Sequence, residues 1–435
     1  MTVYTRDKAV VVIDFRQVGP LVSALILNPQ QVTKGGPARL MEEGTFFQIL
    51  DRFVDDGCLE FVQGERRVRV GRKDTAPTAV IRIQNPRFFK RVLADGNLGM
   101  GEAFMDHDFE MEQGTVSDFL TVLVRNRLAK RLAGGLTIRT AAKLLWIRLV
   151  NRIRGRRSAI RVHYDYDDDS LFEAFLDPRM IYSCGYVKDP GGTIGELQRD
   201  KLQRICEKLR LQLGERLVDL GCGYGGLLIY AAQNYGISGK GCTLGRRHYE
   251  RAKANVAAAG LSDRIEIELV PYEEITGTFD KLVSVEMIEH LRRSEYRRFV
   301  DTVSRLLTEK GMGLVQYIAC TERRNDHDPF IQKYVLPDSS QPKLSEVVAE
   351  LEDHDMAVLD VENLVTHYGH TLRAWTNDFV SNSPRLDGSR YDDRFKRMWQ
   401  YYLECSAAAA FASAGALYQI QFARNYPPPL PLQRV

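Results

Sequence analysis

A glycine-rich turn after a short apolar strand is the feature of this sequence that could most directly bind a ligand. Residues 216–220 read as a strand that contains Asp219, and a helix-compatible run begins at Leu227. Between them lies the turn Gly221-Cys222-Gly223-Tyr224-Gly225-Gly226. Because glycines lack a Cβ atom, such a turn lets a ligand lie against backbone N–H groups at the N-terminus of the following helix.

Two classes of ligand fit this turn. Gly221, Gly223 and Gly226 satisfy the G-x-G-x-x-G fingerprint of dinucleotide-binding folds. The D-x-G-x-G-x-G arrangement that starts at Asp219 more closely resembles the S-adenosyl-L-methionine (SAM) loop of class I methyltransferases. We therefore predict a SAM site, with an NAD site or a purely structural turn as the alternatives.

The elements that must position this turn alternate between strand and helix. We expect strands at 216–220, 239–244, 264–269, 281–285, 313–318 and 357–362, with helices at 194–211, 227–235, 247–259, 294–307 and 343–354. This alternation predicts a doubly wound parallel sheet with the ligand at the carboxyl ends of its strands. The predicted fold class is α/β, a Rossmann-like class I methyltransferase sheet with a smaller α+β N-terminal accessory domain.

With 435 residues, the chain is long enough for two domains. We expect an N-terminal accessory domain for lipid docking over 1–125, a basic amphipathic linker over 126–160, a SAM-dependent methyltransferase domain over 161–425 and a flexible proline-rich tail over 426–435. Within the first domain we expect a helix at 46–54, strands at 58–62, 67–70 and 79–83, and further helices from Asn85 onward.

Composition narrows the class of protein further. The net charge of +3 predicts no chain-wide nucleic-acid surface, and the seven scattered cysteines lack the C-x-x-C pairs of zinc sites. This cysteine usage suits a reducing cytosol. Neither a signal-peptide layout nor a run of 18 apolar residues is present in the sequence. We expect no metal site and a cytoplasmic protein.

A basic amphipathic stretch precedes the second domain. Residues 119–164 contain twelve Lys or Arg and no Asp or Glu, and apolar residues around Trp146 lie between the charges. Such a segment is typical of a peptide that lies on an anionic membrane surface. We expect peripheral association with the inner face of the cell membrane, with a solvated linker as the alternative and nucleic acid as a poorer one.

Several spaced motifs resemble those of the cyclopropane-fatty-acyl-phospholipid synthase and mycolic acid cyclopropane synthase family. Besides the glycine turn they are His163-Tyr164-Asp165, 171–178, Tyr182-Ser183-Cys184-Gly185-Tyr186, 283–290, 367–372 and 395–403. The resemblance spans about 45–425, more loosely in the N-terminal part through 99–105. It implies a class I SAM-dependent methyltransferase, and the longer members of the family suggest a homodimer.

The resemblance implies a set of SAM-binding residues: Tyr182, Ser183, Asp219, Gly221, Gly223, Thr243, His248, Tyr272, Glu273 and Val285. Residues 182–183 match the contacts to the methionine end, Thr243 the ribose contact and 272–273 the adenine contacts. The family has Gln where this chain has His248, which leaves that contact open. Asp219 as a strand-end cap and 272–273 as an exposed loop pair are the structural alternatives.

The resemblance also implies an acceptor, the cis double bond of an unsaturated acyl chain in a membrane phospholipid. An alkene is a weak nucleophile that gains a methyl group only as a carbocation develops. Such a site needs dry walls, aromatic faces and a nearby carboxylate. A base must then remove a proton, and in the family this base is a bound bicarbonate ion. The implied product is a cyclopropane fatty acid.

The residues that the resemblance places around bicarbonate are Cys184, Glu289, Gln316, Ile318 and Tyr368. Glu289 is expected to share a proton with the ion, because two bare anions would repel, and Ile318 to act through its backbone. Gln316 stands where the family usually has His, and Gln cannot titrate. The alternative is therefore a sibling fatty-acid methyltransferase that makes a methyl- or methylene-branched chain. Core packing for Cys184 and Tyr368, and helix capping for Glu289, are the structural alternatives.

Other functions fit fewer of the residues. A catalytically dead lipid-binding module has no need of Cys184, Glu289 and Tyr368 together, and a small-molecule or nucleic-acid methyltransferase leaves the motifs 182–186 and 367–372 unexplained. Aromatic residues near the C-terminus are expected to line an acyl channel or to pack in a helical core: Trp399, Tyr401, Tyr402, Phe411 and Tyr418.

Overall fold

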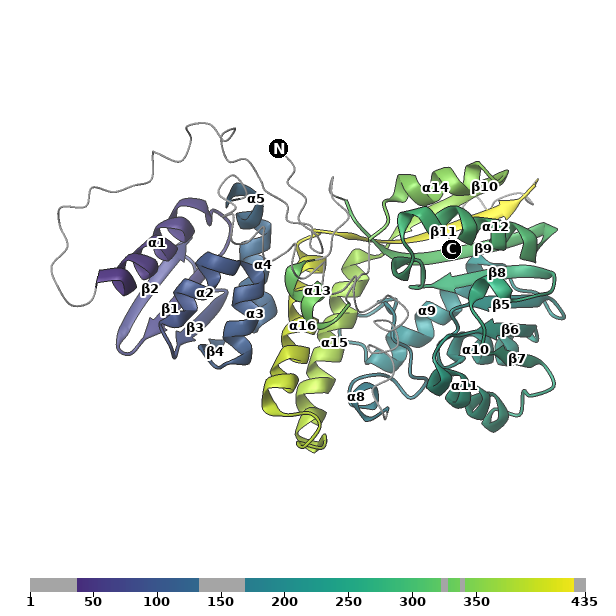
Figure 1. Cartoon of the computed structure of the whole chain (residues 1–435), viewed down its shortest axis with the longest axis horizontal. Coiled ribbons are helices and arrows are strands. Elements are labelled where there is room, and N and C mark those ends of the chain that lie inside the picture. Colours follow the sequence, from purple (N-terminus) through teal and green to yellow (C-terminus); the bar gives the residue numbers. More distant parts are fainter. Residues whose placement is uncertain (1–36, 133–168, 322–327, 337–340, 426–435) are drawn as a thin grey trace, which may run out of the picture.

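The computed structural model describes residues 37–132, 169–321, 328–336 and 341–425. The motif at 163–165, most of the basic stretch and the tail at 426–435 lie outside the described residues. Two β-sheets organise the rest, one of four strands and one of seven. Figure 1 shows them at opposite ends of the molecule, with the long helices α15 and α16 between them.

The smaller sheet lies in the N-terminal part and has the strand order β2-β1-β3-β4. Its strands are β1 (Cys58–Gln63), β2 (Arg66–Gly71), β3 (Ala79–Ile83) and β4 (Phe109–Gln113). Its helices are α1 (Pro37–Phe53), α2 (Arg87–Asp95), α3 (Asn97–Met105), α4 (Val116–Arg125) and α5 (Leu128–Leu132). Helices and strands share one apolar core that includes Phe46, Phe61 and Phe119. The predicted strands are present, whereas β4 replaces a stretch that we expected to be helical.

The larger sheet has the order β10-β11-β9-β8-β5-β6-β7. Its strands are β5 (Arg216–Leu220), β6 (Ser238–Cys242), β7 (Ile265–Glu268), β8 (Phe279–Val285), β9 (Leu307–Ala319), β10 (Met356–Asn363) and β11 (Ala416–Arg424). β5 to β9 run parallel, as predicted. The sheet differs from the predicted parallel arrangement at one edge, where the additional strand β11 inserts antiparallel between β9 and β10. Tyr418 therefore lies on a strand.

Helices cover both faces of this sheet. They are α9 (Ile194–Lys208), α10 (Gly226–Tyr235), α11 (Arg246–Ala258), α12 (Tyr296–Leu306) and α14 (Leu344–Glu352). The other helices of this part are α8 (Ser170–Glu173), α13 (Pro329–Tyr334), α15 (Val365–Asn382) and α16 (Asp393–Phe411), which contribute to the apolar core shared with the N-terminal part. Short 3₁₀ turns are η3 (Tyr272–Glu274), η4 (Ile288–His290), η5 (Arg293–Glu295) and η6 (Ser383–Arg385). Leu217 packs with α9, α10 and α11, whereas Val218 packs with α12 and α14. Alternate residues of β5 thus fill two separate cores.

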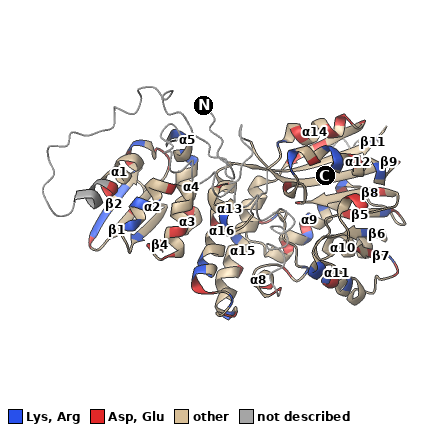
Figure 2. Ribbon diagram, in the orientation of Figure 1, with Lys and Arg blue, Asp and Glu red and all other residues tan. Residues whose placement is uncertain are grey.

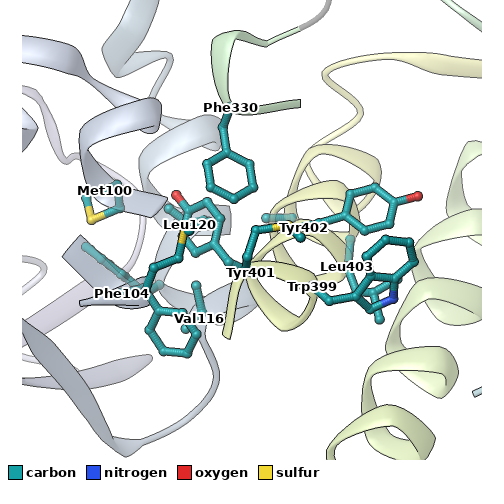
Figure 3. Close-up of a cluster of buried hydrophobic side chains, with 14 of the residues drawn as sticks. Met100, Phe104, Val116, Leu120, Phe330, Trp399, Tyr401, Tyr402 and Leu403 are labelled. Atoms are coloured by element: carbon teal, nitrogen blue, oxygen red, sulfur yellow. The ribbon is translucent and has the colours of Figure 1, made fainter. Parts of the chain in front are cut away.

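Helix α16 joins the N-terminal unit to the rest of the chain. Figure 3 shows side chains of α3, α4 and α13 around its buried aromatic residues, among them Phe104 and Phe330 around Tyr401. The Tyr401 hydroxyl donates to Oδ1 of Asn97 at 2.6 Å. Trp399 and Tyr401 are fully buried here. For these two residues the helical-core alternative holds.

Candidate active site

The glycine turn leaves the sheet at the end of β5. Gly221, Gly223 and Gly225 have φ angles of +93°, +52° and +81°, which favour glycine. The N–H of Gly221 donates to the carbonyl of Cys242 at 3.2 Å and ties the turn to the end of β6. A Cβ atom added at Gly223 would meet no other atom within 4 Å. Space is therefore open beside this residue, as a bound ligand requires.

Asp219 is buried on β5, just before the turn. Burial raises its pKa to about 7, and the charge of Lys201 on α9 acts in the opposite direction. Lys201 is itself buried, and its Nζ donates to Oγ of Ser183 at 2.8 Å. The carbonyl of Ser183 accepts a second hydrogen bond from Nε2 of Gln198 at 2.7 Å. These contacts hold the segment around Ser183 against α9, close to the end of β5.

The other predicted cofactor residues follow neighbouring strands. Thr243 comes directly after β6, Tyr272 begins η3 after β7, and Val285 ends β8. Tyr272 packs on Phe299 with 5.7 Å between the ring centroids. Because β5 to β8 are parallel, all these positions lie at the same edge of the sheet. The structure thus brings the strand-end positions of the predicted SAM set to one edge.

Two members of the predicted set lie on separate elements at this edge. His248 is on α11, and its ring centroid lies 4.5 Å from that of Tyr224 in the glycine turn. Glu273 is partly exposed on η3, where its carbonyl accepts from Arg305 at 3.0 Å. Because His248 contacts the glycine turn, His248 remains a candidate cofactor residue.

Tyr182 lies in an aromatic cluster between its own loop and helices α15 and α16. Its hydroxyl is 2.6 Å from that of Tyr402, and its ring centroid is 5.2 Å from that of Trp375. Phe172 and Phe175 pack against the same ring. Tyr182 is partly exposed whereas Trp375 is fully buried. The cluster thus offers an aromatic surface of the kind that stabilises a cation.

The predicted catalytic residues come together from distant parts of the chain. The N–H of Ile318 on β9 donates to Oε1 of Glu289 on η4 at 2.5 Å. Cys184, Ile318 and Tyr368 share one small apolar cluster. Gln316 lies two residues earlier on β9 and is fully buried. Oε2 of Glu289 is buried and has no hydrogen-bond partner among the described residues.

A residue without a predicted role lies at the centre of this group. Glu286 is the first residue after β8, and its Oε1 accepts from the N–H of Cys184 at 2.8 Å and from Nε2 of Gln316 at 2.9 Å. Its φ angle is +52°, which is uncommon for a residue other than glycine. An acidic residue directly after an apolar parallel strand was the signal for it in the sequence. Lys201, on α9, was missed as well.

Burial sets the protonation of the two carboxyl groups. It raises the pKa of Glu286, and the hydrogen bonds from Cys184 and Gln316 oppose this shift. Burial raises the pKa of Glu289 further, well above its usual value, and the charge of Glu286 adds to the effect. Neighbouring carboxyl groups with different surroundings take different protonation states. Burial and the neighbouring charge thus favour the protonated form more strongly at Glu289 than at Glu286, which makes Glu286 the better candidate for the ionised member of the pair.

Comparisons with known proteins agree with this geometry. The sequence profile of the family described as mycolic acid cyclopropane synthetase matches residues 151–421. The chain is 35% identical to the cyclopropane-fatty-acyl-phospholipid synthase of Escherichia coli (strain K12) over 361 residues. This match covers 82% of this chain and 91% of the relative. It is 30% identical to the tuberculostearic acid methyltransferase of Mycobacterium tuberculosis, over 78% of this chain and 82% of the relative.

Solved structures give the same result for the fold. A cyclopropane synthase from Mycobacterium tuberculosis superposes with a TM-score of 0.58 at 22% identity, over 61% of this chain and 98% of that one. A mycolic acid cyclopropane synthase complexed with SAH and CTAB superposes with a TM-score of 0.57 at 25% identity and the same coverage. The predicted α/β methyltransferase fold is confirmed. The chain belongs to the mycolic acid cyclopropane synthetase family and is a SAM-dependent methyltransferase.

Proposed function

We propose that the chain transfers the methyl group of SAM to the cis double bond of an unsaturated acyl chain in a membrane phospholipid. The observation that carries this proposal is the pair of carboxyl groups, the partly exposed Glu286 and the buried Glu289, beside an aromatic cluster at the cofactor edge of the sheet. The name of the Escherichia coli relative and that of a Pseudomonas putida relative, a probable fatty acid methyltransferase, support a lipid acceptor.

The cofactor residues fit SAM. The glycine turn offers open space, and Asp219, Thr243 and Val285 surround it from adjacent strands. When bound there, SAM supplies an electrophilic methyl group on a sulfonium. The chain's own residues supply the rest: the rings of Tyr182 and Tyr368 form a weakly polar wall for a cationic acyl chain, and the carboxylate of Glu286 supplies negative charge.

The bicarbonate ion that the resemblance implies stays a prediction, and the donor set does not fit a further anion well. The N–H of Cys184 and the amide of Gln316 both donate to Glu286, and the N–H of Ile318 donates to Glu289. With these donors engaged, an added anion would meet two carboxyl groups and little positive charge. We therefore derive no step through bicarbonate.

Two products remain open. Loss of a proton from the transferred carbon closes a cyclopropane ring when that carbon bonds to the cationic carbon, and leaves a methylene branch when a hydride shift has first moved the cation to the methylated carbon. Loss from a chain carbon leaves a methyl branch beside a double bond. Gln316 donates to Glu286 and accepts at its own Oε1 from Nε2 of Gln419 at 2.8 Å. Its role in our proposal is to orient the Glu286 carboxylate. One relative is named a tuberculostearic acid methyltransferase, and for this reason we keep the branched product as a second candidate.

One incubation tests the reaction and its product together. Purified protein with SAM and vesicles of monounsaturated phospholipid is expected to add the mass of one CH₂ group to the acyl chains, read by mass spectrometry of the fatty methyl esters. A product that resists hydrogenation contains a ring, and one that takes up hydrogen contains a branch with a double bond. Acyl chains that all keep their starting mass would contradict the proposed function.

We propose that the N-terminal part and the basic linker dock the enzyme on the bilayer, with domains at 1–125, 126–160 and 161–425 and a tail at 426–435. None of the described helices could cross a membrane. Figure 2 shows Lys and Arg along β2. There, however, Arg67 and Arg69 both pair with Glu60, so the linker carries the net positive charge in this proposal. Location at the inner face of the cell membrane and a homodimer are further proposals.

Electrostatic docking predicts that salt weakens membrane binding. We expect the protein to sediment with anionic phospholipid vesicles at low ionic strength and to be released as ionic strength rises, because salt screens exposed charges. Neutral vesicles are the control and should retain less protein at low salt. Binding to anionic vesicles that does not change with salt would remove the electrostatic part of the proposal.

A further inference from the structure

Glu286 occupies the position from which a proton acceptor could serve the acyl chain. It follows β8 directly, at the edge of the sheet where the cofactor residues lie. It is partly exposed, whereas Cys184, Glu289 and Gln316 around it are buried. Glu286 is therefore the member of this group that is not fully enclosed, as a residue that meets a ligand must be.

The hydrogen bonds of Glu286 favour its ionised form and leave one oxygen available. Cys184 and Gln316 both donate to Oε1, and no described residue donates to Oε2. The titratable groups that act on it are Cys184, Lys201, Glu289, Tyr368 and Tyr402. Within this group Lys201 is the only cation among the described residues, and its Nζ donates to Ser183. Glu286 is thus an ionisable acceptor without a direct ion pair.

The backbone at Glu286 adopts a conformation that is unfavourable for a residue other than glycine. A φ angle of +52° disfavours residues with a Cβ atom, and glycine would adopt it freely. Strained residues of this kind cluster at functional sites, where the surrounding structure holds them. The N–H of Glu286 donates to the carbonyl of Gln316 at 2.7 Å and fixes the turn. This conformation, together with its two donors, holds the side chain of Glu286 in one place.

We propose that the Glu286 carboxylate is itself the base that removes the proton from the methylated acyl chain, in place of a bound bicarbonate ion. This inference rests on the proposed function. It assigns the two carboxyl groups different roles: Glu286 accepts the proton from the acyl chain, and Glu289 is the protonated neighbour that can exchange its proton with Glu286.

The step balances without another reactant. The electron pair of the alkene forms a bond to the methyl carbon as the bond from that carbon to sulfur breaks, which leaves a neutral thioether and a cationic acyl chain. Oε2 of Glu286 takes a proton from this chain, and the electrons of the broken C–H bond form the ring bond or a new double bond. Glu286 is then a neutral carboxylic acid that returns its proton to solvent between turnovers.

The first test removes the base and keeps its shape. Glu286→Gln is expected to lower turnover on monounsaturated phospholipid vesicles by at least about 100-fold, the scale of general base catalysis. SAM affinity by calorimetry and the melting temperature should stay near wild type. The matched control is Glu404→Gln, because Glu404 is also a buried acid with two hydrogen bonds, to Ser117 and Gln400, but lies between α16 and α4. The control should keep its activity.

The second test asks which base the protein uses. Wild-type turnover should not change when bicarbonate is removed with CO₂-free buffer or added back. Glu286→Gly relieves the backbone strain and opens space at the same place, so added bicarbonate should restore part of the lost turnover in this variant alone. A wild-type enzyme that needs bicarbonate, together with a Glu286→Gln variant that turns over normally, would overturn the inference.

A binding measurement covers the case in which no product forms. The probe is a phospholipid whose acyl chain carries a secondary ammonium group at the position of the double bond, compared with the same chain carrying an uncharged thioether. Glu286→Gln should weaken binding of the ammonium probe on the order of tenfold and leave the thioether probe unchanged. Equal effects on both probes would contradict the role of Glu286. A wild type that binds SAM but methylates no lipid would instead contradict the proposed function.

Discussion

Glu289→Gln is expected to lower turnover by at least about 100-fold, with SAM affinity unchanged. Glutamine has the size of the native side chain and can still accept the hydrogen bond from the N–H of Ile318. It cannot gain or lose a proton, whereas burial and the charge of Glu286 make Glu289 a group that holds one. The expectation is the same whether Glu286 or a bicarbonate ion removes the substrate proton, because in both cases Glu289 has to exchange its proton with that base, which a glutamine amide cannot do.

The measurement is the turnover number on unsaturated phospholipid vesicles, beside calorimetry with SAM. Glu404→Gln serves again as the control for the loss of a buried carboxyl group, since it lies outside the site. Near-normal turnover of Glu289→Gln would show that its proton takes no part. A joint loss of SAM binding and of thermal stability would show a structural role instead.

The sequence alone was sufficient for the elements whose patterns are local. The parallel strands were predictable because short strand-like segments alternate with helical periods along the chain, and the glycine turn marks where the first of them ends. The carboxyl ends of parallel strands lie at one edge of the sheet. The sequence therefore predicts that residues as distant as Gly221, Thr243 and Val285 lie close together at that edge. Boundaries differ by a few residues, as at 313–318 within β9.

Features that depend on distant partners were not predictable in this way. Residues 416–424 form a strand only because β9 and β10 supply hydrogen bonds on both sides. From the sequence alone, the aromatic residues of α16 could equally have lined a channel. They are core residues because the N-terminal part packs against them. A role for Glu286 could not be predicted, because the two groups that donate hydrogen bonds to it belong to Cys184 and Gln316, which are far away in the sequence.

The second large effect is expected at the glycine turn. Gly223→Val should weaken SAM binding by at least about 100-fold, because a β-branched residue is strained at a positive φ angle and its side chain would enter the space left for the ligand. No atom lies within 4 Å of the added Cβ, so the protein should still fold. Calorimetry gives the affinity, and a thermal melt gives the cost to stability.

A matched variant separates strain from loss of the site. Gly260 also has a positive φ angle, +68°, and open space around its Cβ position, but it lies between α11 and β7, at the amino end of that strand. Gly260→Val should therefore lower the melting temperature by a similar amount and leave SAM affinity unchanged, because it introduces the same backbone strain at a place far from the cofactor edge. If both variants bind SAM like the wild type, the turn does not contact the cofactor. If both lose it equally, strain and not position is the cause, and only a selective loss in Gly223→Val places SAM against the turn.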